Sequence, residues 1–298
     1  MENLKKYIPR EIEEVVQVYW KELVEIRLRI HQPLILEGVA GEKIVPEIPI
    51  TEKMLKEILN KITNYSLYAY EREMKDGYIT VEGGHRIGLA GEGTVKDGSL
   101  CGIRHIRFMN IRICRRFENY GDELLEKVSM NNQIRNTLII SAPGMGKTTL
   151  LRSLVQKCSD GIPGTSIVVI DERNEISGAY HGIPQIPLGI RTDVMTGMDK
   201  VDGIIRSVRS MGPKVIAVDE LGEEGDMEAI QWAMNSGTVV FATIHGTDLK
   251  WVQRKMGESL FRRFSLKILI GERGRYQCFC EELEHCSSRL AEEFTASH

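Results

Sequence analysis

Apolar and polar residues alternate along the first third of the chain as they do in half-buried strands. Over much of 22–36 every second residue is apolar, which predicts two strands joined by a short turn. Over 51–64 apolar residues recur every three or four positions, which predicts an amphipathic helix. Short strand-like segments interrupted by glycines over 78–116 predict an antiparallel meander. We therefore expect a smaller α+β N-terminal domain over residues 1–116.

After Asn136 the pattern changes to short, continuous apolar runs that are rich in β-branched residues. The runs TLIIS, SIVVID, VIAVDE and TVVFATIH are separated by stretches with helical spacing. Strands buried on both faces have this composition, and their alternation with helices implies a parallel sheet with helices on both sides. The expected fold class is therefore α/β, with a mostly parallel central sheet in a domain over 137–298 and a polar linker over 117–136.

Composition and charge narrow the class of protein further. The chain has 298 residues, 42% of them hydrophobic and 27% charged, which is typical of a globular protein and excludes a disordered or fibrous one. Its net charge of −3 provides no strong positive field that would attract nucleic acid or anionic lipid. Every apolar run is shorter than the ~18 residues that a membrane-spanning helix needs, and the N-terminal residues lack the pattern of a secretory signal. We expect a cytoplasmic protein that is not an integral membrane protein.

The segment SAPGMGKTT, residues 141–149, follows a predicted strand and precedes a predicted helix, as a phosphate-binding loop does. Its glycines allow backbone N–H groups to point at a phosphate, and the start of the helix adds partial positive charge. We expect Lys147 to contact the β- and γ-phosphates of ATP, Thr148 to bind Mg²⁺, and Thr149 to contact the α-phosphate. Ser141 stands where the usual pattern has its first glycine. The predicted ATP-binding residues are Pro143, Gly144, Met145, Gly146, Lys147, Thr148 and Thr149.

Acidic residues follow two of the predicted parallel strands, at the strand ends where ligands of open α/β sheets bind. Asp219 and Glu220 end the run VIAVDE, and we expect Asp219 to hold Mg²⁺ and Glu220 to orient and polarise the attacking water. Glu172, directly after the run SIVVID, is the alternative base, and it could instead contact Mg²⁺ or pair with Arg173. His245 ends the run TVVFATIH, where its imidazole could donate a hydrogen bond to the γ-phosphate.

These segments occur in the order seen in a known family. The loop SAPGMGKT, the acidic box VVIDERNE, the segment VIAVDE and the strand end TIH resemble those of the secretion ATPases of type II, type IV and pilus-retraction systems. The segments EIRLRIHQPL and GGHRIGLAG narrow the resemblance to the sporulation ATPases of endospore-forming bacteria. The resemblance implies a RecA-like P-loop ATPase domain. In such a domain the strand ending at His245 lies between the strand TLIIS, which precedes the loop, and the Walker B strand VIAVDE.

The same resemblance implies partners and further site residues. Relatives bring arginines from the first domain to the phosphates, and the matching residues here are Arg86 and Arg104, with Arg112 as a third candidate. Relatives also form rings, usually of six subunits, so the resemblance implies a homo-oligomer and specifically a hexamer. The implied partners are membrane proteins of the sporulation channel between mother cell and forespore, with the ATPase peripheral at the inner face of the mother-cell membrane. Where secretion relatives usually carry Gly-Glu, this chain has Asp219-Glu220.

Two other functions stay open. A nucleic-acid-dependent RecA-like motor would use the basic cluster from Arg104 to Arg116, but Phe108 is the only aromatic residue inside it, which disfavours base stacking and nucleic acid as a partner. An ATP-gated scaffold would bind ATP and hydrolyse little of it. A zinc site is disfavoured because its candidate ligands lack the usual spacing; these are Cys278, Cys280, His285 and Cys286.

Overall fold

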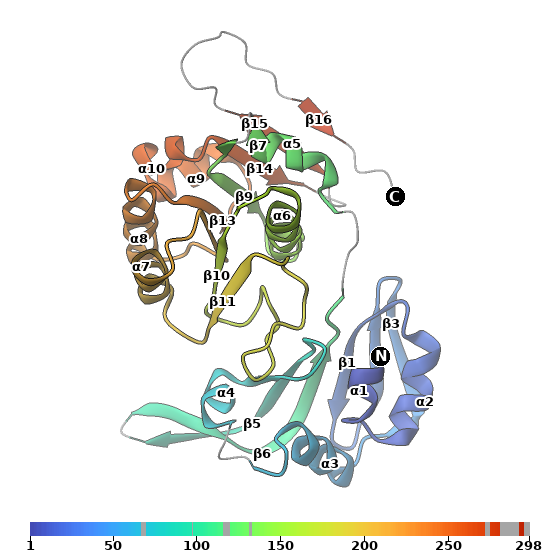
Figure 1. The fold of residues 1–298 in the computed structure, drawn as a ribbon. Coiled ribbons are helices and arrows are strands. Elements are labelled where there is room, and N and C mark those ends of the chain that lie inside the picture. Colours follow the sequence, from blue (N-terminus) through green and yellow to red (C-terminus); the bar gives the residue numbers. More distant parts are fainter. Residues whose placement is uncertain are drawn as a thin grey trace. The chain divides into compact units, whose positions relative to one another are not determined.

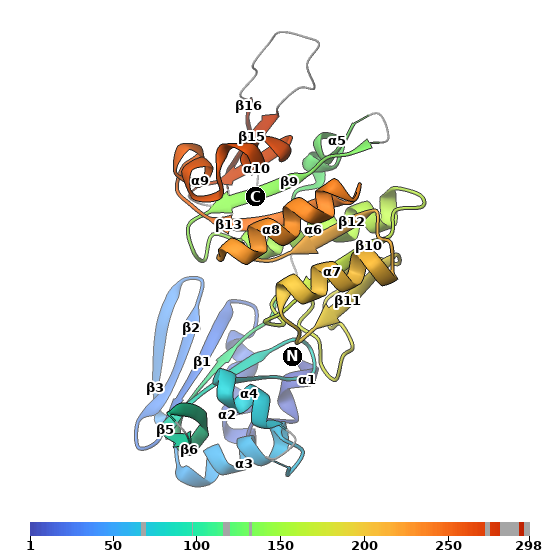
Figure 2. The same cartoon turned by 90° about the vertical axis from the view of Figure 1, so that its left-hand side faces the viewer.

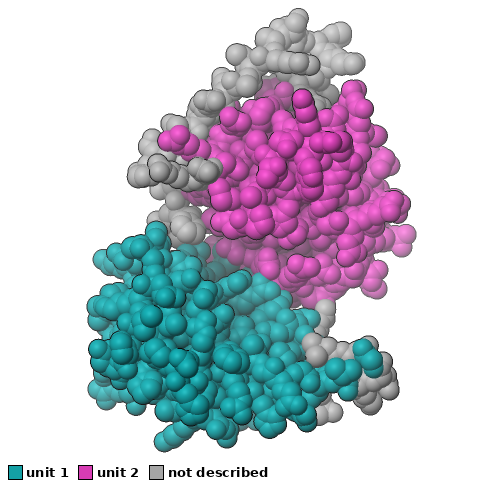
Figure 3. Space-filling model, turned by 180° about the vertical axis from the view of Figure 1, so that it is seen from behind, with its two compact units in different colours: residues 1–116, 178–186 teal, residues 117–177, 187–298 magenta. Residues whose placement is uncertain are grey.

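The computed structural model, drawn in Figures 1 and 2, describes residues 1–66, 70–96, 98–115, 120–130, 133–271, 275–280 and 292–294. The chain divides into two compact units, coloured separately in Figure 3. Unit 1 contains Met1–Arg116 and Gly178–Ile186, whereas unit 2 contains Phe117–Ser177 and Pro187–His298. The hydrophobic pattern did not indicate that Gly178–Ile186, which lies within the second half of the sequence, belongs to unit 1. The residues expected to form a linker belong to unit 2.

Unit 1 is built on a six-stranded sheet with the strand order β3-β2-β1-β6-β5-β4. Every neighbouring pair of strands in this sheet is antiparallel. The predicted strand pair, helix and meander correspond to β1 with β2, to α3, and to β4 through β6. The elements are α1 (Glu2–Lys5), α2 (Arg10–Tyr19), β1 (Leu23–Arg29), β2 (Pro33–Gly38), β3 (Gly41–Pro49), α3 (Glu52–Ile62), α4 (Glu71–Asp76), β4 (Tyr78–Thr80), β5 (Arg86–Lys96) and β6 (Ser99–Arg112).

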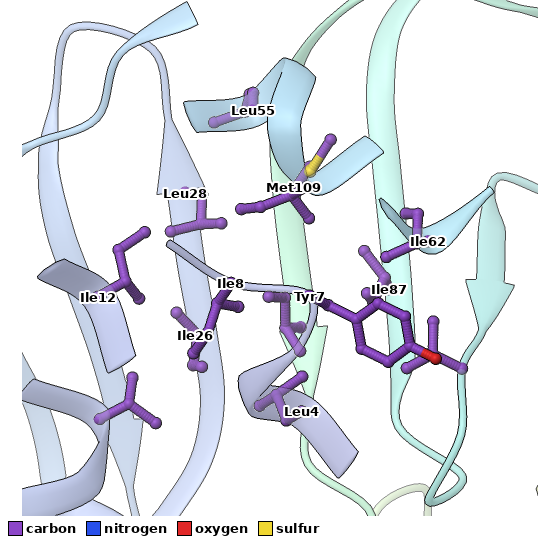
Figure 4. Packing of buried hydrophobic residues seen from close by; sticks show 14 of the residues in the cluster. Leu4, Tyr7, Ile8, Ile12, Ile26, Leu28, Leu55, Ile62, Ile87 and Met109 are labelled. Carbon is purple, nitrogen blue, oxygen red and sulfur yellow. The ribbon is translucent and has the colours of Figure 1, made fainter. Parts of the chain in front are cut away.

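The helices of unit 1 bury their apolar faces against the sheet. Ile12 of α2 and Leu55 of α3 belong to the same buried cluster as Leu28 of β1 (Figure 4). The start of α3 is fixed by the Thr51 hydroxyl, which accepts a hydrogen bond from the Met54 N–H at 3.2 Å. Since each fully buried aliphatic side chain contributes roughly 1.5–3 kcal/mol, this cluster gives unit 1 a core of its own.

Unit 2 is built on an eight-stranded sheet with the strand order β11-β10-β12-β13-β9-β14-β15-β16. The pairs from β11 through to β14 are parallel, and β15 and β16 extend the sheet by antiparallel pairing. The predicted α/β fold class is therefore confirmed, and β13 lies between β9 and β12 as the resemblance implied.

The elements of unit 2 alternate between helix and strand along most of its length. They are η2 (Asp122–Leu124), α5 (Leu125–Val128), β7 (Ser129–Met130), β8 (Gln133–Ile134), β9 (Thr137–Ser141), α6 (Lys147–Gly161), β10 (Ile167–Asp171), β11 (Thr192–Thr196), α7 (Lys200–Ser210), β12 (Val215–Val218), α8 (Glu224–Asn235), β13 (Val239–His245), α9 (Leu249–Met256), α10 (Glu258–Arg263), β14 (Leu266–Ile270), β15 (Tyr276–Cys280) and β16 (Glu292–Phe294). The short β7 and β8 form a separate two-stranded sheet.

Helices cover both faces of the parallel strands, with α6 on one face and α7 and α8 on the other (Figure 1). Successive residues of each strand point to opposite faces. Ile139 of β9 therefore packs in the cluster that contains Leu151 of α6, whereas its neighbour Ile140 packs in the cluster that contains Ile230 of α8. Because apolar contacts cover both faces of the sheet, polar functional side chains are expected at the strand ends and in the loops that follow them.

The sequence disfavoured both a membrane-spanning helix and a zinc site. In the part of the chain that the structure describes, no helix is long and apolar enough to span a bilayer. Within the same residues, no group of three or more His, Cys, Asp or Glu side chains is placed to hold a metal ion. His285 and Cys286 of the disfavoured zinc site lie outside the described residues.

Candidate nucleotide-binding site

The carboxyl ends of four adjacent strands meet at one edge of the unit 2 sheet. Taken in the order β10, β12, β13 and β9, these ends carry Asp171, Asp219, His245 and Ser141. The strand residues that precede them are almost all buried, so the packing of the sheet fixes where each polar side chain emerges. Parallel pairing thus gathers residues that are far apart in the sequence.

The loop between β9 and α6 turns at two glycines. Gly144 and Gly146 have φ values of 75° and 94°, a conformation that favours glycine, and Gly146 is the N-cap of α6. Lys147 begins the helix and is buried, and its Nζ donates to the carbonyl oxygens of Ser141 and Ala142, each at 3.3 Å. Burial lowers the pKa of Lys147, whereas the carboxylates of Asp219 and Glu220 oppose that shift. The ammonium group lies beside a helix N-terminus, which favours a bound anion.

The residues predicted to bind Mg²⁺ lie in direct contact. The Thr148 hydroxyl donates to Asp219 Oδ2 at 3.0 Å, and the Thr243 hydroxyl donates to the other oxygen, Oδ1, at 2.7 Å. Thr243 is fully buried in β13, so its hydroxyl fixes the Asp219 carboxylate. A hydroxyl and a carboxylate are the hard oxygen ligands that Mg²⁺ prefers.

Glu220 has a backbone conformation that is unusual for a glutamate, with a φ of 24°. Its N–H donates to Asp219 Oδ1 at 3.0 Å and to Thr243 Oγ1 at 2.9 Å. Its carbonyl oxygen accepts a hydrogen bond from Lys200 Nζ at 2.7 Å. These contacts hold the backbone in place and direct the Glu220 side chain toward His245, with 3.1 Å between Oε1 and Nε2.

His245 connects the lysine of the loop to the candidate base. Its Nδ1 lies 2.9 Å from Lys147 Nζ, and its Nε2 lies 3.1 Å from Glu220 Oε1. A neutral imidazole with its proton on Nε2 satisfies both contacts, because it accepts from the ammonium group and donates to the carboxylate. The group that would contact a phosphate is therefore linked to the group that would activate water.

A polar pocket of about 140 Å³ adjoins these residues and is lined by both Glu172 and Glu220. Lys200, at the start of α7, also lines it, and its Nζ lies 3.0 Å from Asp226 Oδ2 and 4.0 Å from Glu172 Oε2. Asp226 Oδ2 further accepts hydrogen bonds from the N–H groups of Gly222 and Glu223, at 3.0 and 3.2 Å. The two candidate bases thus share one pocket, in which Lys200 contacts both residues.

Asp171, at the end of β10, organises the turn that follows the strand. Its carboxylate accepts hydrogen bonds from the N–H groups of Glu175, Ile176 and Ser177 at 2.7, 2.9 and 2.7 Å, and from the Ser177 hydroxyl at 2.5 Å. Burial raises the pKa of Asp171, and these hydrogen bonds oppose that shift. The turn leads directly to Gly178, where the chain enters unit 1.

The arginines that the resemblance implied are residues of unit 1, and each has a contact within that unit. The Arg86 guanidinium lies over the Tyr78 ring, 3.5 Å from its centroid. Arg104 is exposed and pairs with Glu92 at 2.5 Å, and Arg112 pairs with Glu25 at 3.3 Å. A role of Arg86 and Arg104 at the phosphates stays a prediction.

Comparison with known proteins identifies the family. The family model for sporulation stage III, protein AA matches residues 2–279. The stage III sporulation protein AA of Bacillus subtilis (strain 168) is 37% identical over 275 residues, which cover 91% of this chain and 86% of that protein. The chain belongs to the sporulation stage III protein AA family. This member is also 25% identical over 259 residues to SEEDLING PLASTID DEVELOPMENT 1 of Arabidopsis thaliana, covering 84% of the chain and 33% of that protein.

Solved structures show the fold of this stage III AA family member. The pilus retraction motor PilT with bound ADP aligns with a TM-score of 0.63 at 14% identity, covering 92% of this chain and 84% of that one. The ATPase DotB of Legionella pneumophila aligns with a TM-score of 0.61, also at 14% identity, covering 92% and 77%. This chain therefore shares its fold with both of these proteins.

The sequence predicted no role for three residues of the candidate site, Thr243, Lys200 and Asp226. Thr243 bonds both Asp219 and Glu220, and Asp226 pairs with Lys200, which in turn bonds the Glu220 carbonyl. For Lys200 one signal was present in the sequence, because a cation in the first turn of a helix opposes the helix dipole. For Thr243 no signal distinguished its hydroxyl from the apolar residues of the same strand.

Proposed function

We propose that this protein is an Mg²⁺-dependent ATPase whose site lies at the strand ends of unit 2. The observation that carries the proposal is the hydrogen bond of 3.0 Å between Thr148, at the start of α6, and Asp219, at the end of β12. It brings a loop suited to phosphate together with an acid suited to Mg²⁺. Membership of the family and the fold shared with secretion-type ATPases support the same function.

The residues present fit Mg²⁺ better than a softer metal. Thr148 and Asp219 offer only oxygen ligands, and Mg²⁺ characteristically completes its shell with water and substrate phosphates. When bound, the ion would neutralise charge on the phosphate oxygens. The small number of protein ligands is therefore what a magnesium–nucleotide site requires.

The other side chains have distinct roles in this proposal. The N–H groups of the loop and the start of α6 would bind the phosphates, and Lys147 would add a positive charge at the γ-phosphate. Glu220 would orient water and accept its proton, with Glu172 in the same pocket as the alternative. His245 would transmit the presence of phosphate, since a ligand that draws Lys147 away also breaks its contact with Nδ1.

For the assembly we propose a homo-oligomer, with six subunits as in the secretion motors that the sequence resembles. Arg86 and Arg104 would then supply charge to the phosphates, because a guanidinium is always charged and can bind two oxygens. The ATPase would energise a membrane channel between mother cell and forespore from the cytoplasmic face of the mother-cell membrane. The family supports the sporulation setting, and the resemblance to secretion motors supports the channel.

The test is turnover of ATP by the purified protein with and without Mg²⁺. Lys147→Ala should abolish both ATP binding and hydrolysis. Glu220→Gln should still bind ATP but turn over at least ~100-fold more slowly, because the amide cannot accept the proton. The exposed Glu228 on α8 provides the matched control, and Glu228→Gln should leave turnover unchanged. Full turnover in Glu220→Gln would assign the base to Glu172.

The same preparation separates the alternatives. A large stimulation by DNA that is lost at high salt would indicate the nucleic-acid-dependent motor. Tight ATP binding with no hydrolysis would indicate the ATP-gated scaffold. The molecular mass in solution with and without ATP tests the ring, and substitution of Arg86 and Arg104 in the same turnover assay tests their contact with the phosphates.

A further inference from the structure

The backbone of Glu220 needs support from its surroundings. Its φ of 24° lies in the left-handed region, which costs free energy for any residue other than glycine. Such a conformation persists only where neighbouring contacts fix it. On the N–H side the contacts are Asp219 and Thr243, at 3.0 and 2.9 Å. On the carbonyl side the contact is Lys200 Nζ, at 2.7 Å.

Lys200 is placed against the preference of its own helix. It is the first residue of α7, where the positive end of the helix dipole disfavours a cation. Its side chain is only 12% exposed, and Nζ also lies 3.0 Å from Asp226 Oδ2 and 4.0 Å from Glu172 Oε2. The ammonium group donates hydrogen bonds to the Glu220 carbonyl oxygen and to Asp226 Oδ2, and the Glu172 carboxylate lies nearby as a third oxygen group. The turn after β12, the start of α8 and the end of β10 thus converge on one side chain.

We propose that Lys200 is a positioning residue for ATP hydrolysis, an inference that rests on the proposed ATPase function. Lys200 fixes the Glu220 backbone from the carbonyl side. The Glu220 carboxylate then faces His245 and the loop that precedes α6. Lys200 bonds the main chain of Glu220 and not its carboxylate. Its loss should therefore disturb the orientation of the base and leave nucleotide binding intact.

The kinetic test compares two variants of Lys200 with wild type. Lys200→Met keeps the length of the side chain without the donors, and kcat should fall roughly 10- to 100-fold, as expected for one lost hydrogen bond to a charged donor. KM for ATP and the Kd for ADP should change less than about 2-fold, because the residue acts on the chemical step. Lys200→Arg, which retains charged donors, should recover most of kcat.

A half-buried lysine elsewhere in unit 2 provides the matched control. Lys157 on α6 pairs with Asp122, and Lys157→Met removes an ion pair that is more exposed than that of Lys200 and lies outside the candidate site. If Lys200 only stabilised the fold, both methionine variants would lose stability while kcat per folded molecule stayed at the wild-type value. We expect the fall in kcat for Lys200→Met alone.

A second measurement does not depend on turnover. The N–H groups of Glu220 and Leu221 are bonded in the folded protein, the latter to the Thr243 carbonyl at 2.8 Å. Hydrogen exchange at these two amides, in the nucleotide-free protein, should be at least about 10-fold faster in Lys200→Met and unchanged in Lys157→Met. Should the methionine variant not fold, Lys200→Ala, which also lacks the donors, is measured against the same limits.

The outcomes are distinguishable. A wild-type kcat in Lys200→Met, or unchanged exchange at Glu220 and Leu221, overturns the inference. If the wild-type protein hydrolyses no ATP, the proposed ATPase function is wrong instead. In that case the exchange measurement decides by itself whether Lys200 holds the turn at Glu220.

Discussion

Thr243 joins the two acids of the candidate site, and removal of its hydroxyl tests the geometry directly. The side chain is fully buried. Its Oγ1 donates to Asp219 Oδ1 at 2.7 Å and accepts a hydrogen bond from the Glu220 N–H at 2.9 Å. Thr243→Val preserves the shape of the side chain and removes both hydrogen bonds. We therefore expect lower stability of unit 2 and a lower kcat.

The expected loss of stability in Thr243→Val depends on which hydrogen bonds Asp219 and Glu220 keep. A hydrogen bond to a charged group contributes ~1.5–3 kcal/mol. In the valine variant the Glu220 N–H still has Asp219 Oδ1 as acceptor, at 3.0 Å, so neither group is left without a partner. The expected loss lies in the lower part of that range, about 2 kcal/mol. For a domain of this size the loss corresponds to a fall in Tm of roughly 4–8 °C.

The assay follows thermal unfolding of unit 2 by tryptophan fluorescence. The chain has three tryptophans, so a Trp20→Phe background leaves Trp232 and Trp251 of unit 2 as the reporters. Thr243→Ser is the matched control, because it keeps the hydroxyl and loses one buried methyl group, at a cost of about 1 kcal/mol. Its kcat should stay near wild type. A valine variant with the wild-type Tm and kcat would refute the claim that this hydroxyl fixes the acids.

Two further predictions concern stability elsewhere in the chain. Burial lowers the pKa of His85 from 6.5 to about 4. As the pH falls below 6.5 the unfolded chain therefore gains a proton that the folded protein does not, and unit 1 should lose about 3 kcal/mol between about pH 7 and about pH 4. His85→Gln should remove most of that loss in urea unfolding at both pH values, and an equally steep pH dependence would contradict a buried neutral His85. Gly203→Ala should destabilise unit 2 by roughly 1–3 kcal/mol despite the better helix propensity of alanine, because the new Cβ would lie 2.6 Å from Ile170 Cγ2. Equal denaturation midpoints for Gly203→Ala and wild type would show that Ile170 moves aside without cost.

The parallel sheet was predictable because its central strands are buried on both faces. The four apolar runs recognised in the sequence correspond to β9, β10, β12 and β13. The strand β11 carried no such signal, because it lies at the edge of the sheet and its residues are mostly half-buried and polar. An edge strand with a solvated side does not need an apolar run, so the hydrophobic pattern missed it.

The candidate site was predictable only as far as its residues follow strands directly. Lys147, Asp219, Glu220 and His245 were expected at one edge because parallel strands end there, and the structure brings them into contact. The contacts of Lys200 connect it to the turn after β12 and to α8, and the packing of α7 beside α8 determines them. No local pattern in the sequence encodes that packing. Nor would a positive φ be predicted for a glutamate.

The passage of Gly178–Ile186 through unit 1 has a consequence for dividing the protein. The polypeptide crosses between the units after Arg116, after Ser177 and after Ile186, so one cut near residue 117 does not yield two self-sufficient halves. An isolated N-terminal fragment would lack Gln185, whose Oε1 accepts the Gly83 N–H at 2.9 Å. An isolated C-terminal fragment would contain Gly178–Ile186 but lack the rest of unit 1, against which this segment packs. Separately expressed fragments should therefore aggregate or unfold unless they are mixed. Complementation between the two fragments would return the Gly178–Ile186 segment to unit 1.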